Sequence, residues 1–394
     1  MEPSYVSGRA DRPLLGRTIG DQLRRSASAH PDVEALVAPH QDIRLTFAQL
    51  EEASEEVARA LLALGVARGD RVGIWSANRA EWTLVQYATA LIGAILVNVN
   101  PAYRTHELEF VLRRSGIGVR VAARNFRSTD YVAMLDRVRS RAPSLGRIVL
   151  LGAEESWASS WGAFLSGAGK VPREAVAERG SEPDVDDPIN IQYTSGTTGL
   201  PKGATLSHHN ILNNGFFVGE RLGLVPGDRI CVPVPFYHCF GMVMGTLAAL
   251  THGTTVVLPG EAFHPHAVLQ AVERERCTAL YGVPTMFVSE LGSPGFDRFD
   301  LSSLRTGIMA GAPCPVEVMK QEVDRMHMHE VTICYGMTET SPVSFQSLPH
   351  DDLDRRVSTV GRSIRTSRPR SSTRSPGPPS PGGRRASCAR AGTR

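Results

Sequence analysis

The residues best suited to chemistry form one short segment, Tyr193-Thr-Ser-Gly-Thr-Thr-Gly-Leu-Pro-Lys-Gly203, which directly follows the apolar run 189–193. Its glycines permit a tight turn whose backbone N–H groups point inward, its hydroxyls add donors, and Lys202 adds a compact positive charge. These properties are typical of a phosphate-binding loop. The nucleotide-triphosphatase pattern GxxxxGK[ST] does not fit, because Pro201 and Gly203 stand where it requires Gly and Ser or Thr. A flexible surface linker is the alternative.

Two other side chains stand where a ligand could bind. Glu339 lies between two threonines, just after the apolar run 331–335. One carboxylate together with phosphate oxygens suits Mg²⁺, whereas the alternative is a solvated surface acid. His238 lies among aromatic residues, where a lone histidine is either a hydrogen-bonded core residue or part of a pocket. For Glu339 and for His238, the residues alone leave both alternatives open.

The elements that must position these residues alternate along the chain. Short β-branched runs and amphipathic helical patterns follow one another from residue 40 to about 340, which predicts an α/β fold with largely parallel sheets. The clearest helix has one apolar face, formed by Phe47, Leu50, Val57, Leu61 and Leu64. Strands are expected at 71–75, 94–98, 118–122, 147–151, 190–193, 229–233, 254–258, 279–282, 306–310 and 332–335.

Six motifs in order resemble the adenylate-forming superfamily, which includes acyl-CoA synthetases, luciferases and amino-acid adenylation domains. Besides the segment 193–203, they are Leu45-Thr-Phe-Ala-Gln-Leu50, Pro235-Phe-Tyr-His-Cys-Phe-Gly241, Tyr281-Gly-Val-Pro-Thr285, Ala310-Gly-Ala-Pro313 and Tyr335-Gly-Met-Thr-Glu-Thr340. The sequence around residues 235–238 and 335–342 is most similar to that of medium-chain fatty acyl-CoA synthetases. In amino-acid adenylation domains the segment 236–238 typically carries an aspartate, and its absence here favours an uncharged acyl tail.

The resemblance implies the large N-terminal domain of adenylate-forming enzymes, with two mixed or parallel sheets flanked by helices. The polar, proline-bearing stretch 172–188 is expected to join two parts of it, residues 1–187 and the phosphate-loop and acyl-pocket part, residues 188–362. Agreement ends at Arg362. The distal β-barrel part is therefore expected to be incomplete, and the small C-terminal domain, which carries a catalytic lysine in the family, to be absent.

The same resemblance assigns roles to individual positions. The β- and γ-phosphates of ATP would lie against Thr194, Ser195, Gly196, Thr197, Thr198, Gly199, Lys202 and Gly203. Lys202 would neutralise the departing pyrophosphate, Thr338 would donate to the α-phosphate and Glu339 would hold Mg²⁺. The adenine would lie between Tyr335 and the loop residues Gly311, Ala312 and Pro313. The acyl group would lie against His238, Cys239, Phe240, Gly241, Val283 and Gly336.

The implied reaction has two halves. A fatty carboxylate attacks the α-phosphorus of ATP, giving acyl-AMP and pyrophosphate, and the thiol of coenzyme A then displaces AMP. No protein nucleophile is needed. Because the expected C-terminal domain is missing, both halves are expected to be impaired, so the chain is a fatty acyl-CoA ligase by ancestry. A non-catalytic nucleotide- or acyl-binding protein is the alternative.

The last 32 residues, 363–394, differ sharply from the rest. They hold eight arginines, no lysine and no acidic residue, and 19 of them are Ser, Pro, Gly or Thr, which predicts a disordered tail. Read one base off, GC-rich codons for 363–374 can spell a family-like continuation, which favours an out-of-frame reading over an evolved basic tail. Without these arginines the formal net charge of +3 becomes −5, so no nucleic-acid partner is expected for the body of the protein.

Composition restricts location and metal content. The longest apolar run, 87–97, is shorter than the ~20 residues that a membrane span needs, and no signal peptide is recognised. The six cysteines form no CxxC pair and no metal-ligand spacing, which favours reduced thiols, a cytoplasmic location and no structural zinc. The oligomeric state and the acyl chain length are not predicted.

Overall fold

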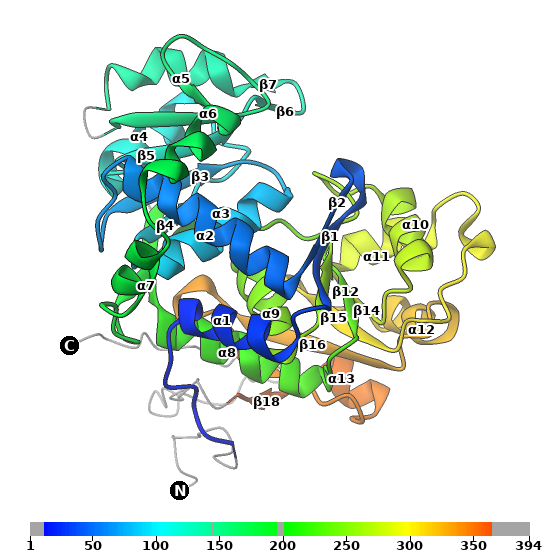
Figure 1. Ribbon diagram of the computed structural model, residues 1–394. Helices are drawn as coiled ribbons and strands as arrows, with labels where there is room; N and C mark the ends of the chain where they lie inside the picture. Colours follow the sequence, from blue (N-terminus) through cyan, green and yellow to red (C-terminus); the bar gives the residue numbers. More distant parts are fainter. Residues whose placement is uncertain (1–11, 143–144, 195–200, 365–394) are drawn as a thin grey trace, which may run out of the picture.

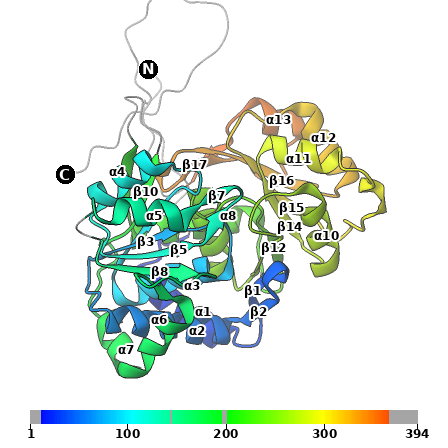
Figure 2. The ribbon, with the colours of Figure 1, turned by 90° about the horizontal axis from the view of Figure 1, so that it is seen from above.

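Two β-sheets and three groups of helices alternate in the computed structural model of the protein (Figure 1). The structure describes residues 12–142, 145–194 and 201–364. Three apolar cores separate the layers: one lies between the sheets, and one lies on the outer side of each sheet. Figure 2 shows the two sheets side by side, each covered by its own outer helices.

The seven-stranded sheet is parallel except for the strand at one edge, β11. Its order is β11 (Lys202–Ser207), β10 (Pro188–Thr194), β4 (Ile95–Asn98), β3 (Arg71–Trp75), β5 (Val119–Ala123), β8 (Arg147–Leu151) and β9 (Ser159–Ser160). Only the pair β10 and β11 is antiparallel, which brings Thr194 opposite Lys202. The two ends of the predicted phosphate-binding loop therefore meet at one edge of this sheet. A separate hairpin pairs β6 (Asn125–Phe126) with β7 (Thr129–Asp130).

The nine-stranded sheet joins distant parts of the chain. Its order is β18 (Arg362–Ser363), β17 (Val343–Gln346), β16 (Glu330–Gly336), β15 (Thr306–Ala310), β14 (Ala279–Gly282), β12 (Arg229–Cys231), β13 (Thr255–Val257), β1 (Glu34–Ala38) and β2 (Ile43–Thr46). The six strands from β16 to β1 are parallel, and their carboxyl ends form one edge. Ligands commonly bind at such an edge in α/β folds.

Helices fill the three remaining layers. The outer helices of the seven-stranded sheet are α4 (Thr105–Ser115) and α5 (Tyr131–Arg139), and those of the nine-stranded sheet are α10 (Pro265–Glu275), α11 (Pro284–Leu291) and α12 (Val316–Arg325). The central core takes α1 (Ile19–Ala29), α2 (Phe47–Ala63), α3 (Ala80–Ile92), α8 (His208–Leu222), the π-helix η3 (Phe240–Leu247) and α9 (Ala248–His252). The other helices are α6 (Trp161–Ser166), α7 (Glu174–Gly180), α13 (Leu353–Ser358), η1 (Pro39–Gln41), η2 (Gly167–Lys170), η4 (Phe296–Arg298) and η5 (Thr338–Thr340).

The predicted α/β fold with two sheets flanked by helices is confirmed. Helix α2 begins after Thr46, whose side chain accepts a hydrogen bond from the backbone N–H of Gln49, and it buries Phe47 and Leu61 as expected. The strands expected at 71–75, 147–151, 279–282 and 306–310 have those same bounds. Across the part that the structure describes, no helix is long and apolar enough to cross a membrane.

The expected division of the chain at residue 188 does not coincide with the division between the two sheets. Strand β10, which begins at residue 188, pairs with β4, and β1 pairs with β13, so both sheets take strands from either side of residue 188. The disordered tail is expected to begin at Ser363. In the structure Ser363, in β18, pairs with Phe345 of β17, and Ile364 is buried. These two residues belong to the fold, because they extend the antiparallel edge of the nine-stranded sheet. Residues 365–394 lie outside the described ranges.

Candidate active site

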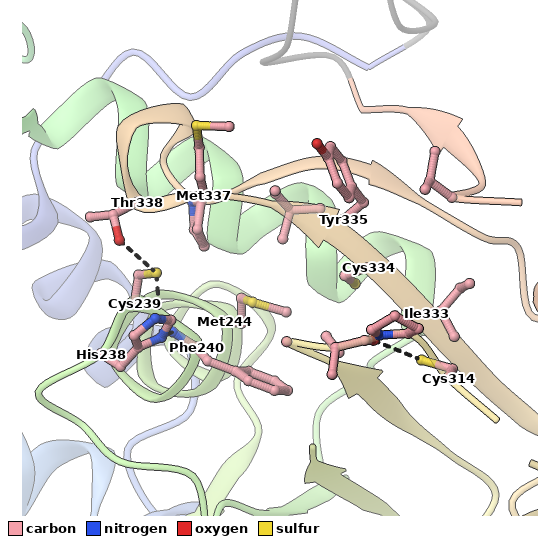
Figure 3. Close-up of a pocket in the computed structure, with 18 of the residues that line it drawn as sticks. His238, Cys239, Phe240, Met244, Cys314, Ile333, Cys334, Tyr335, Met337 and Thr338 are labelled. Carbon is pink, nitrogen blue, oxygen red and sulfur yellow. Dashed lines mark hydrogen bonds between the residues drawn. The ribbon is translucent and has the colours of Figure 1, made fainter. Parts of the chain in front are cut away.

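A cavity of about 630 Å³ opens at the carboxyl ends of the parallel strands of the nine-stranded sheet (Figure 3). Four segments contribute its walls: the start of η3, the loop after β15, the end of β16 with the turn behind it, and the end of α13 with the residues that follow. It is lined by His238, Cys239, Phe240, Met244, 310–314, 333–338, Pro342, Val343 and 357–360. None of these described lining residues is Asp, Glu, Lys or Arg, so the cavity suits an uncharged group.

His238 lies at the entrance to η3 and is exposed to the cavity. Its Nδ1 accepts a hydrogen bond from the backbone N–H of Phe240 at 3.1 Å. The neutral imidazole therefore carries its proton on Nε2. Burial among apolar neighbours lowers the pKa of His238 below its ordinary value, which favours this neutral form.

The thiol of Cys239 bridges two parts of the cavity. Figure 3 shows its Sγ between His238 Nδ1, at 3.6 Å, and Thr338 Oγ1, at 3.7 Å. Burial raises the pKa of Cys239 to about 11, so the side chain is a neutral thiol at physiological pH. Thr338 is buried at the start of η5 and faces the same cavity. Cys239 is therefore a packing and hydrogen-bonding residue here and not an activated nucleophile.

Glu339 and the phosphate-binding segment meet beside the cavity. The Thr194 hydroxyl, at the end of β10, donates to Glu339 Oε1 at 3.1 Å across 145 positions of sequence. Thr194 also faces Lys202 in the strand ladder, and both Lys202 and Glu339 are exposed. The structure thus brings together three of the predicted phosphate-site residues. The other predicted positions in this loop, Ser195, Gly196, Thr197, Thr198 and Gly199, lie outside the described residues.

The expected adenine-binding positions lie on the cavity wall opposite η3. Gly311, Ala312 and Pro313 follow β15, and Tyr335 lies near the end of the neighbouring strand β16. Gly311 has φ +87°, a left-handed conformation that glycine adopts without strain. Gly336 abuts the carbonyl of Pro342 so closely that a β-carbon would not fit. A flat ring therefore has access between small residues and the tyrosine.

Besides Thr194, Lys202 and Glu339, three more predicted site residues are not among the described residues that line the cavity. Gly241 is buried with its Cα against Pro235, where a β-carbon would lie 2.6 Å from the carbonyl oxygen. Val283 packs behind Gly311, and Gly203 pairs with Tyr193 in the strand ladder. These positions shape or support the loops that carry the site.

Several lining residues were missed from sequence. Met244 lies four residues after Phe240, a helical spacing that could have placed both side chains on one face. Val357 and Val360 enter the cavity only because α13 packs against α12 and β16, which no local pattern indicates. Within the described ranges, no three His, Cys, Asp or Glu side chains gather as a metal site.

Solved structures share this fold, and two of them hold a bound ligand. An inhibitor-bound N-terminal domain of FACL13 from Mycobacterium tuberculosis aligns with a TM-score of 0.76 and 26% identity, covering 88% of this chain and 82% of that one. The anthranilate CoA ligase AuaEII in complex with anthranoyl-AMP aligns with a TM-score of 0.78 and 25% identity, covering 90% and 65%. The fold is that of CoA ligases.

A family model described as AMP-binding enzyme matches residues 23–371, and the chain belongs to this family. The YngI protein of Bacillus subtilis is 43% identical over 365 residues, 89% of this chain and 66% of the relative. The mitochondrial medium-chain acyl-CoA ligase ACSF2 of Danio rerio is 42% identical over 376 residues, 92% and 62%. The chain thus spans less than two thirds of the length of these relatives. The resemblance inferred from the motifs is confirmed.

Proposed function

We propose that the chain is an AMP-forming fatty acyl-CoA ligase by ancestry, which binds ATP, Mg²⁺ and a medium-chain fatty acid and performs the adenylation half of the reaction at an impaired rate. Coenzyme A would be the second substrate and the acceptor of the acyl group. One observation carries the proposal: an uncharged cavity is lined by a neutral His238 and by Thr338, which the thiol of Cys239 bridges, and the turn containing Thr338 places Glu339 on Thr194. Relatives named medium-chain acyl-CoA ligases support the substrate class. We further propose a cytoplasmic location.

The phosphate end would use residues that converge from two sheets. Thr194 and Lys202 stand at the two ends of the loop, and the intervening residues 195–199 would add backbone and hydroxyl donors. The Lys202 ammonium would offset the charge of the departing pyrophosphate. The adenine would lie between Tyr335 and the small residues Gly311 and Ala312.

The donor set beside this loop suits Mg²⁺. A hard cation requires oxygen ligands, and the exposed carboxylate of Glu339 with the hydroxyl of Thr194 offers them next to the expected phosphates. A magnesium ion held there would supply charge neutralisation for the phosphate oxygens. Because Glu339 is a single carboxylate, it would act together with the nucleotide.

The acyl end would use the cavity walls to orient the carboxylate. The Nε2–H of neutral His238 would donate to one carboxylate oxygen, while Phe240, Met244 and Val343 would surround the chain. The other carboxylate oxygen would attack the α-phosphorus, its new bond forming as the bond to pyrophosphate breaks. Thr338 would donate to an α-phosphate oxygen. Cys239 remains protonated and takes no covalent part.

The direct test titrates the full chain with ATP and Mg²⁺ and with dodecanoate in a calorimeter, and then follows pyrophosphate release and formation of the coenzyme A thioester. We expect saturable binding of both ligands, with pyrophosphate released only when both are present. Lys202→Ala should reduce this release about 10- to 1000-fold. Lys320→Ala is the matched control, because that lysine pairs with Glu317 at 2.8 Å on the surface of α12.

Two outcomes distinguish the alternatives. Saturable binding without pyrophosphate release would favour a non-catalytic nucleotide- and acyl-binding protein. Flat titrations with both ATP and dodecanoate would contradict any binding role for the cavity.

A further inference from the structure

The segment 234–238, between β12 and η3, carries His238 to the cavity without belonging to a helix or a strand. Pro233 and Pro235 have no backbone N–H, so the segment cannot pair as a regular strand. Val234 and Phe236 are nevertheless buried. Buried backbone N–H and C=O groups need hydrogen-bond partners, and here asparagine side chains of the opposite sheet supply them.

Asn78 supplies two of these partners. The backbone N–H of Phe236 donates to Asn78 Oδ1 at 2.8 Å, and Asn78 Nδ2 donates to the carbonyl of Val234 at 2.9 Å. The side-chain amide of Asn78 thereby makes the two hydrogen bonds, to Val234 and Phe236, that a neighbouring strand would make in a regular sheet. Asn78 follows β3 and is 3% exposed, and its own backbone N–H donates to the carbonyl of Glu261. Asn78 therefore links the end of β3, in the seven-stranded sheet, to the segment that follows β12, in the nine-stranded sheet.

Asn98, at the end of β4, holds the next peptide. Its Nδ2 donates to the carbonyl of Tyr237 at 3.1 Å and approaches Met242 Sδ, in η3, at 3.5 Å. Its Oδ1 accepts from Asn190 Nδ2 at 2.9 Å, and Asn190 also donates to the carbonyl of Leu96. Because Oδ1 and Nδ2 have partners of opposite kind, the orientation of the Asn98 amide is fixed.

We propose that Asn78 and Asn98 are positioning residues that hold segment 234–237 so that His238 presents Nε2–H to the acyl carboxylate; this proposal rests on the proposed function. The link from amide to imidazole is short. Tyr237 immediately precedes His238, and His238 Nδ1 is engaged by the N–H of Phe240 at the start of η3. If the segment shifts, this N–H and Nδ1 separate, and the imidazole is free to exchange tautomers and rotamers.

The test compares Asn78→Ala and Asn98→Ala in the full chain by nitrogen NMR of the imidazoles. The chain has 12 histidines, so the His238 signals are assigned from their loss in His238→Gln. In the unmodified protein we expect Nδ1 without a proton and Nε2 protonated. In each variant we expect shifts that report a mixture of tautomers.

Binding gives a second readout that separates positioning from general damage. The probe is the non-hydrolysable acyl-adenylate mimic 5′-O-(N-dodecanoylsulfamoyl)adenosine, measured beside ATP alone. Each lost hydrogen bond should weaken binding of the mimic about 3- to 10-fold. ATP alone should lose less than about twofold, because its expected contacts lie on other loops.

Asn213→Ala is the matched control. Asn213 is also fully buried and also exchanges two hydrogen bonds with a backbone, that of Leu15, at 2.7 and 3.1 Å. Its loss should lower stability and leave the His238 signals in place. Asn78→Asp, which keeps the acceptor for Phe236, replaces Asn78→Ala if the alanine variant does not fold.

The outcomes are separable. Unchanged His238 signals in the variants of both Asn78 and Asn98, or equal shifts in Asn213→Ala, would overturn the positioning role. If the unmodified protein does not bind the mimic but the His238 signals still move in the two variants, the proposed function fails and the positioning role stands.

Discussion

Glu339 approaches the phosphate end of the site as a single carboxylate, held by the hydroxyl of Thr194 at 3.1 Å. A cation bound there must complete its shell with phosphate oxygens and water. Affinity for the metal alone should therefore be weak, whereas affinity for the metal–nucleotide complex should depend on this side chain.

We therefore predict that Glu339→Gln weakens binding of ATP with Mg²⁺ roughly 10- to 100-fold. Binding of metal-free ATP should change little, because the amide keeps the size of the carboxylate and loses only its charge. Calorimetric titrations with and without Mg²⁺ measure both. Glu317→Gln, on the surface of α12, is the control. An equal loss with and without Mg²⁺ would assign Glu339 to the nucleotide and not to the metal.

The proximity of single residues could be predicted where chemistry and local sequence coincide, while their roles in binding stay predictions. Glu339, Thr338 and Lys202 stand in short segments whose composition indicates phosphate and cation binding, and the structure gathers Thr194, Lys202 and Glu339. Asn78 and Asn98 carry no such signal. Their partners lie about 140 to 160 positions away in sequence, so only the packing of the two sheets reveals them.

At the scale of elements, α11 and α12 share an apolar core that contains two carboxyl groups. Glu290 and Glu322 are fully buried, and within the described residues their four carboxyl oxygens have no hydrogen-bond partner. Burial raises the pKa of Glu290 to about 8, and burial together with the neighbouring Glu290 raises that of Glu322 well above its usual range. Both side chains are therefore mainly protonated at neutral pH.

This proton uptake predicts the direction of a pH effect on stability. Between about pH 4.5 and 8 the folded protein keeps the proton of Glu290, whereas the unfolded chain releases it. The stability linked to this proton is fully present below this range and is lost as pH rises through it. The slope approaches 1.4 kcal/mol per pH unit for one proton. Glu290→Gln is always neutral and should gain at least about 1 kcal/mol on the unmodified protein between pH 5 and pH 8.

Urea unfolding of both proteins at pH 5 and pH 8 measures this difference. Glu174→Gln, an exposed position at the start of α7, should follow the unmodified protein at both values. A Glu290→Gln variant whose free energy of unfolding differs from the unmodified protein by the same amount at both pH values would refute the shifted pKa.

Elements were predictable where their pattern is local. The parallel strands β3, β8, β14 and β15 are short apolar runs between turn residues, and their bounds follow from the sequence. Strands β1 and β18 lack that independence. The hairpin of β1 and β2 joins the rest of the sheet through the distant strand β13, and β18 joins it through β17, so pairing and not propensity defines their place.

At the scale of the molecule, the arginine-rich residues 365–394 carry all of the excess positive charge. A chain that ends at Ile364 has a formal charge of −5, and one that ends at Gly361 has −6. These two chains are almost equal in charge, but the shorter one lacks the whole of β18 and Ile364. Comparing them therefore isolates the packing of the last described residues from the electrostatics of the tail.

We predict that the chain ending at Ile364 melts within about 1 °C of the full chain, whereas the chain ending at Gly361 melts several degrees lower. Ile364 is 1% exposed and its N–H donates to Ser344, and Arg221 donates to the carbonyl of Ser363. Losing these contacts should cost about 2 to 4 kcal/mol. Calorimetric scans of the three chains test this boundary. If all three chains melt at the same temperature, the stable fold ends before Arg362. If both shortened chains melt equally far below the full chain, residues 365–394 have a stabilising role.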